Sequence, residues 1–102
     1  MTPELEQVTF RRSTSGHKAS VEVWELVSAS GEVFAWAEIF AAPSQWGVRV
    51  QDRAPGVADG DLVKLVGKLL TWEVHCPADT VDVVLGRSHD HHTLVKVGGE
   101  YV

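Results

Sequence analysis

The residues of this chain best suited to chemistry are a tetrad near its end, His89-Asp90-His91-His92. Neutral imidazole nitrogens and carboxylate oxygens bind zinc and other first-row divalent ions. In an extended segment His89 and His91 point one way while Asp90 and His92 point the other, so at most two ligands can meet at one ion. A metal site therefore needs further ligands, and the candidates are His75, Cys76 and His17.

Two other interpretations of the tetrad stay open. It can be a polar loop between two strands, in which Asp90 favours the turn conformation and the histidines are solvated. One histidine could instead act as a pH sensor or an acid–base group, because an unperturbed imidazole titrates near neutrality. One hypothesis is thus a metal- or histidine-dependent enzyme that uses His89, His91 and His92 with His75. Zinc or a similar divalent ion is the one cofactor that the sequence suggests.

A second hypothesis concerns the basic segment from Arg11 to Lys18, in which Arg11, Arg12 and Lys18 accompany hydroxyl groups and a glycine. Charge-assisted hydrogen bonds from these side chains could bind a phosphate or a nucleic acid. The formal net charge of −5 disfavours a general affinity for nucleic acids or anionic membranes. The alternative is that the segment is an ordinary solvated loop.

Length and composition limit the architecture. A chain of 102 residues can bury one hydrophobic core, so we expect a single domain over residues 1–102. No stretch approaches the roughly 20 apolar residues of a membrane-spanning helix, and we expect no membrane association. The single Cys76 excludes an intramolecular disulfide, and the first residues lack the basic and apolar regions of a secretory signal. We therefore expect a cytoplasmic protein.

The pattern of apolar residues predicts six strands and one helix. Alternating or β-branched runs predict strands at 6–11, 21–28, 33–41, 46–53, 80–85 and 93–97. Leu62, Leu65, Val66 and Leu69 recur at helical spacing, which predicts a helix over about 60–75 that ends before Pro77. The expected fold class is α+β: an antiparallel meander of about four strands, then the helix on one sheet face, then two short strands.

The clearest part of the sequence is the predicted hairpin of 21–28 with 33–41. If Ser28 pairs with Val33, strict alternation places Trp24 and Leu26 on one face, together with two alanines that leave room for the helix. The other face carries the four residues that we predict to form an interface or a pocket, which are Val23, Phe34, Trp36 and Phe40. One helix can cover only one face, so the C-terminal strands or a second copy of the chain should cover this one.

Two glutamates fall on the same predicted face as these aromatic residues. Glu25 and Glu38 could form an acid–base pair, because two carboxylates in apolar surroundings raise one another's pKa. The alternative is that each pairs with an arginine such as Arg11 or Arg49.

The leading hypothesis from the sequence is a small cytoplasmic protein-interaction module. We expect it to be a homodimer that associates through its apolar sheet face, and another protein is a further possible partner. Its support is the two-sided apolar character of the hairpin and the lack of any catalytic motif of known spacing.

Overall fold

The computed structural model describes residues 5–13, 21–42, 45–54, 56–86 and 88–102. These residues form seven strands, which are β1 (Thr9–Arg12), β2 (Val21–Val27), β3 (Val33–Ala42), β4 (Gln45–Asp52), β5 (Thr80–Leu85), β6 (Asp90–Val97) and β7 (Glu100–Tyr101). Their helices are the 3₁₀ helix η1 (Leu5–Gln7), the α-helix α1 (Asp59–Lys68) and the π-helical turn η2 (Leu69–Val74). Because η2 continues α1 directly, the predicted helix over 60–75 is confirmed as one helical segment.

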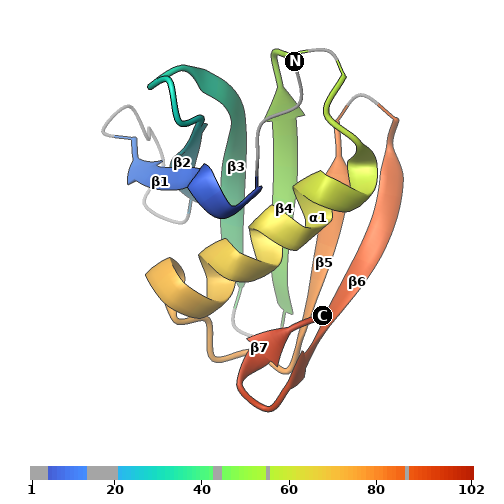
Figure 1. Cartoon of the computed structure of the whole chain (residues 1–102). Coiled ribbons are helices and arrows are strands. Elements are labelled where there is room, and N and C mark those ends of the chain that lie inside the picture. The colour runs from blue at the N-terminus through green and yellow to red at the C-terminus, as the bar shows by residue number, and fades with distance from the viewer. Residues whose placement is uncertain (1–4, 14–20, 43–44, 55, 87) are drawn as a thin grey trace.

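The strands form one sheet in chain order, and the sheet curls around the helix (Figure 1). All neighbouring strands are antiparallel except β4 and β5, which are parallel. The α+β class with the helix on one sheet face is confirmed. The expected wholly antiparallel sheet of six strands is wrong, because α1 and η2 carry the chain back to the end of the sheet where β4 began. The two-residue β7 was also missed.

The hairpin register is correct along most of its length. Trp24 pairs with Ala37 and Leu26 with Ala35, as expected. A β-bulge then shifts the register, so that Val27 pairs with Val33 and the Ser28 backbone N–H donates to the Glu32 carbonyl. The expected pairing of Ser28 with Val33 is therefore wrong, because an extra residue near the turn is left out of the ladder. Away from the bulge the two faces remain those that alternation predicts, but Phe34, at the bulge, is buried with the core and not on the face predicted for it.

The core lies between the helical segment and the inner face of the sheet. On the helix, the fully buried residues are Leu62, Leu65, Val66, Leu69 and Leu70. Ala35 and Ala37 on β3 are also fully buried, and their small side chains let the helix approach the sheet closely. Each buried leucine contributes about 1.5–3 kcal/mol relative to exposure, so this contact is the main source of stability.

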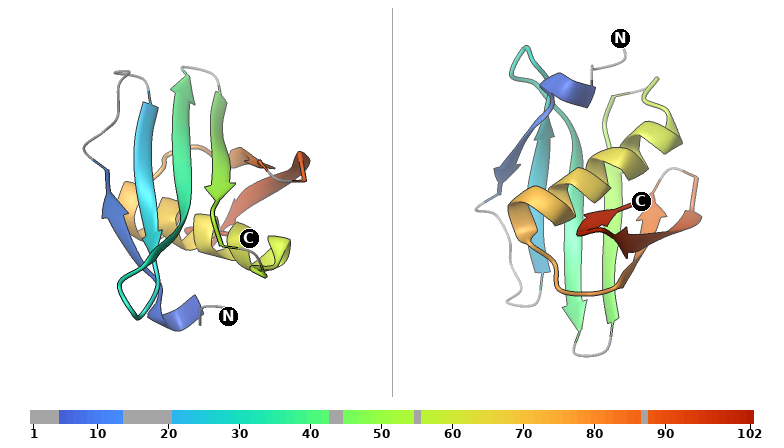
Figure 2. Two further views of the ribbon diagram at one scale, coloured as in Figure 1. Left: turned by 90° about the horizontal axis from the view of Figure 1, so that it is seen from above. Right: turned by 60° about the horizontal axis from the view of Figure 1, so that its bottom comes forward.

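Hydrogen bonds of Tyr101 connect the C-terminal strand β7 to the end of the helical segment and to the residues that follow it. β7 lies beside the helix on the same side of the sheet (Figure 2). The Tyr101 hydroxyl lies within hydrogen-bonding distance of the carbonyl oxygens of Cys76 and Ala78. The Tyr101 backbone N–H donates to Thr71 Oγ1 at 3.4 Å, and that hydroxyl donates to the Gly67 carbonyl at 2.8 Å. These contacts connect the chain's last residues to the helix.

Gly67 allows the close approach of β7. A Cβ at this position would lie 3.0 Å from the Tyr101 carbonyl oxygen, whereas a Cβ at Gly60 would meet no atom within 4 Å. We expect Gly67→Ala to lower the free energy of unfolding by about 1–2 kcal/mol, because the hydrogen-bonded strand cannot retreat. Gly60→Ala is the matched control and should raise it by about 0.5–1 kcal/mol through helix propensity. Urea unfolding measures both, and equal gains for both variants would contradict the close contact.

Tyr101 should make stability fall at high pH. Burial, and then its contact with Cys76, raises the pKa of Tyr101 above its ordinary value. Above about pH 10 the unfolded chain therefore loses this proton while the folded chain keeps it, so stability falls by about 1.4 kcal/mol per pH unit. Tyr101 is the only tyrosine, so tyrosinate absorbance reports it directly. Tyr101→Phe should lower stability by about 1 kcal/mol at neutral pH and remove this part of the alkaline loss. Tyrosinate formation near pH 10 in the folded protein would contradict the assignment.

Candidate functional site

The sheet has one face that no described helix or strand covers. We call it the outer face, and the pairing register assigns to it Arg11, Val23, Glu25, Trp36, Glu38, Phe40, Arg49, Gln51, Asp82, Val84, His91 and Thr93. The helical segment and β7 lie on the opposite side (Figure 2). The C-terminal strands do not fold over the outer face, because they continue the same sheet beside β4.

Three of the four predicted interface residues lie on the outer face. Val23 and Trp36 are half-buried and Phe40 is 39% exposed. The Arg53 guanidinium lies 4.4 Å from the centre of the Trp36 ring, so it covers part of the indole. Phe34 is only 5% exposed and packs with the hydrophobic core, beside the bulge of the hairpin. Phe34 therefore offers little surface to a partner.

Charged residues separate the hydrophobic residues of the outer face. Arg11 Nε lies 2.6 Å from Glu25 Oε1, which confirms an arginine partner for that glutamate. Glu38 pairs in register with Arg49 on the neighbouring strand. Because both signs of charge alternate across the strands, the face has no large area of one sign.

The histidine tetrad is divided between the two faces of the sheet, as alternation predicts. His89 lies in a turn with a φ of 56°, and β6 begins at Asp90. His91 lies on the outer face, with Nδ1 3.4 Å from Asp82 Oδ2. His92 pairs in register with Val83 on the inner face, and its Nε2 is buried without a hydrogen-bond partner.

The structure does not bring His75 to the tetrad. Ser88 precedes the tetrad directly, and its Oγ lies 3.3 Å from Oδ2 of Asp59, the first residue of α1. The tetrad therefore follows a residue that lies at the start of the helical segment. His75 follows the last residue of that segment, roughly 20 Å away at the helical rise per residue. Within the described ranges, no group of three or more His, Cys, Asp or Glu side chains could hold a metal ion. His17 lies outside these ranges.

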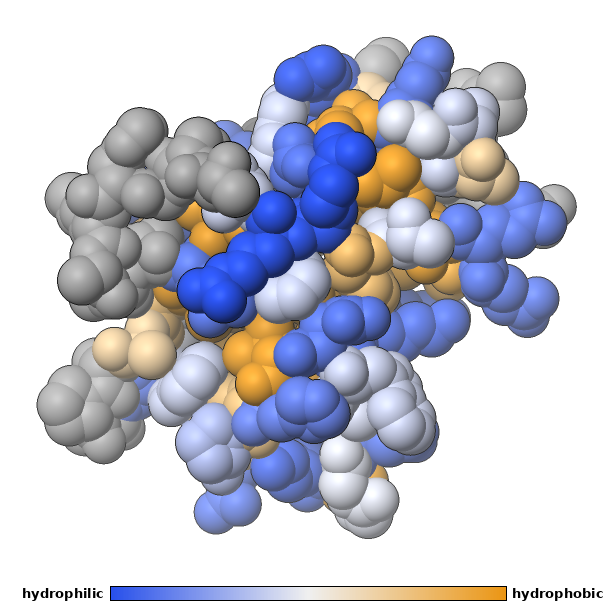
Figure 3. Space-filling view, turned by 90° about the vertical axis from the view of Figure 1, so that its left-hand side faces the viewer, coloured by the Kyte–Doolittle hydropathy of each residue, from blue (hydrophilic) through white to orange (hydrophobic). Residues whose placement is uncertain are grey.

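The arginines of the predicted phosphate site have acidic neighbours. Arg11 pairs with Glu25, and Arg12 Nε lies 3.8 Å from Glu22 Oε1. Lys18 lies outside the described residues. Figure 3 faces the β1 side of the molecule and shows a strongly hydrophilic band with hydrophobic patches on both sides. The two arginine charges are thus each offset by a neighbouring carboxylate.

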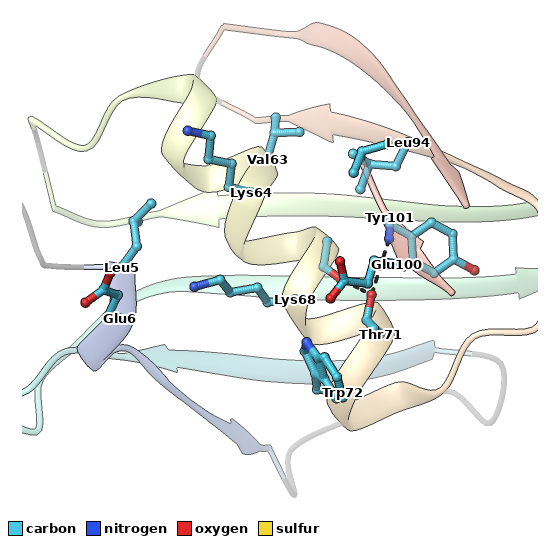
Figure 4. A pocket seen from close by; sticks show the side chains of 12 residues that line it. Leu5, Glu6, Val63, Lys64, Lys68, Thr71, Trp72, Leu94, Glu100 and Tyr101 are labelled. Atoms are coloured by element: carbon cyan, nitrogen blue, oxygen red, sulfur yellow. Dashed lines mark hydrogen bonds between the residues drawn. The ribbon is translucent and has the colours of Figure 1, made fainter. Parts of the chain in front are cut away.

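An open pocket of about 530 Å³ lies on the helix side of the molecule (Figure 4). Two neighbouring rows of residues on the helical segment line the pocket, each with a spacing of four residues. One row is Val63, Gly67 and Thr71, and the other is Lys64, Lys68 and Trp72. Its walls are η1, with Leu5 and Glu6, and β6 and β7, with Leu94, Glu100 and Tyr101, followed by Val102. We call it the helix-side pocket.

The sequence analysis missed this pocket. Its only local signal was the spacing of Lys64, Lys68 and Trp72, which places two cations and an indole on one side of the helix. Trp72 is 63% exposed, although tryptophan is highly buried on average in folded proteins.

No protein-family model, curated protein or solved structure matches this chain. None of the described helices is long and apolar enough to cross a membrane. The structure thus offers two candidate binding surfaces, the outer face and the helix-side pocket, and one unusual polar atom, His92 Nε2.

His92 tests the metal hypothesis. We expect His92→Leu to raise the free energy of unfolding by about 1 kcal/mol, because it removes a buried polar atom without a partner. His91→Leu on the exposed side of the same strand is the control and should change stability by less than about 0.5 kcal/mol. Thermal unfolding with and without a chelator measures both. A wild-type protein that zinc stabilises and a His92→Leu variant that zinc does not would identify His92 as a metal ligand instead.

Proposed function

We propose that this protein is a small interaction module whose outer face associates with a second copy of the chain. The observation that carries the proposal is a sheet face that no described helix or strand covers and that still bears Val23, Trp36 and Phe40. An antiparallel sheet with one solvated face ordinarily shows polar side chains there. Aromatic residues and arginine are also the types enriched at protein interfaces.

The arrangement of charge supports a second copy as the partner. Glu38 and Arg49 lie side by side on neighbouring strands of the outer face. Two copies related by a two-fold axis place the same surface against itself, so the glutamate of one copy can meet the arginine of the other. A face with both signs of charge is suited to self-association, whereas a face of one sign would repel its copy.

A reducing compartment such as the cytoplasm is part of this proposal. Its support is Cys76, a single cysteine that is buried and free. The metal-dependent enzyme has no comparable support, since the described residues bring no three potential ligands together and His75 lies far from the tetrad. Phosphate or nucleic-acid binding is likewise weakened by the ion pairs of Arg11 and Arg12.

Phe40→Glu tests the outer face as the interface. The side chain is 39% exposed, so the variant should fold, and a carboxylate at this position should weaken the dimer at least about tenfold through desolvation. Trp72→Glu is the matched control, because it replaces an exposed aromatic residue on the helix side and should leave association unchanged. Sedimentation velocity over a range of concentrations measures the dissociation constant. A wild-type chain that stays monomeric at about 500 µM would contradict the proposal.

A charge exchange tests whether the partner is a second copy. Arg49→Glu places a second carboxylate beside Glu38 and should also weaken the dimer about tenfold. The double variant Glu38→Arg/Arg49→Glu exchanges the two charges. Within one sheet, and between two copies related by a two-fold axis, a positive residue then still faces a negative one, so the variant should recover most of the dimer affinity. Failure of the double variant to recover, with unchanged thermal stability, would show that these two residues do not face each other across the interface.

A further inference from the structure

We infer that the helix-side pocket binds a small amphipathic monoanion, an apolar chain or ring that ends in a carboxylate. This inference is independent of the proposed self-association, because the pocket and the outer face lie on opposite sides of the sheet (Figures 2 and 4). Its volume of about 530 Å³ falls within the range of small-molecule sites.

The apolar part of the ligand is indicated by the side chains that line the pocket. Val63 and Leu5 are only partly buried, and Val102 is 69% exposed. The hydroxyl of Thr71 in the lining is already engaged, since its Oγ1 donates to the Gly67 carbonyl and accepts from the Tyr101 backbone N–H. An apolar body can therefore enter without leaving this hydroxyl buried and unpaired.

The charged end of the ligand is indicated by two lysines. Lys64 and Lys68 are exposed, lie one helical turn apart and extend toward the same side of the pocket (Figure 4). Side chains at this spacing are about 5–6 Å apart at Cβ, so both ammonium groups can reach the two oxygens of one carboxylate. In the described part of the chain, no ion pair within 4 Å engages either lysine.

The acidic residues of the pocket limit the charge of the ligand. Glu6 lies on η1 and Glu100 on β7, so they belong to opposite walls and cannot converge on one cation as the lysines converge on one anion. Their two negative charges oppose the entry of a dianion such as a phosphate monoester. A single carboxylate is therefore the head group that the pocket favours.

The test is isothermal titration with decanoate below its micelle concentration. We expect saturable binding of one decanoate per chain, and at least tenfold weaker binding to the Lys64→Gln/Lys68→Gln variant. Arg49→Gln is the matched control, since it removes a cation from the outer face and should not change the affinity. Decanol and decyltrimethylammonium have the same chain without the carboxylate and should bind at least tenfold more weakly.

Val63→Phe provides a second test, because the larger side chain should fill the pocket and abolish decanoate binding while thermal stability stays near the wild-type value. Trp72 fluorescence provides a third measurement. Its signal is obtained by subtracting the fluorescence of the Trp72→Phe variant from that of the wild type. It should change with decanoate concentration in parallel with the calorimetric titration. The inference is overturned if decanoate does not bind saturably, if both lysine changes leave its affinity unaltered, or if decanol binds as tightly. Monomeric behaviour in sedimentation would contradict the proposed dimer and leave this titration unaffected.

Discussion

The packing of one helical segment against the inner face of the sheet is the contact on which the rest of the structure depends. It requires Ala35 and Ala37 at the centre of β3, where larger side chains would hold the helix away. It also requires the helix to connect β4 and β5, which makes that pair parallel. Because this helical segment packs on the inner face alone, no described helix or strand covers the outer face.

The sequence predicted those elements that local patterns specify. The β-branched and aromatic runs of the hairpin and the spacing of Leu62, Leu65 and Leu69 each identify an element without reference to the rest of the chain. The parallel pair depends on where the helix returns the chain, which is a property of tertiary packing. β7 has two residues, too few for any periodicity, and its position is set by contacts of Tyr101 with the distant Cys76 and Ala78.

The candidate sites likewise divide into features that local sequence patterns specify and features that depend on tertiary packing. The division of His91 and His92 between two faces follows from strand alternation, so it could be predicted. The separation of His75 from the tetrad could not, because it depends on tertiary packing, which places Ser88 beside Asp59 at the start of the helical segment and His75 at its far end. The helix-side pocket combines Leu5 with Val102, from opposite ends of the chain, and no sequence pattern links such residues.

The outer face is suited to selective rather than indiscriminate association. Trp36 already has Arg53 over its ring, and Val23 and Val84 are half-buried by their own neighbours. Only newly buried apolar area adds free energy, at about 25 cal/mol per Å², so a second copy gains less here than it would on a bare hydrophobic sheet. The charges between these residues must also find partners or lose hydration without compensation. In the proposed dimer, a surface that meets Glu38 and Arg49 with opposite charges avoids that loss, whereas a surface without them does not. Under this proposal, charge placement rather than hydrophobic area decides which partner the outer face accepts.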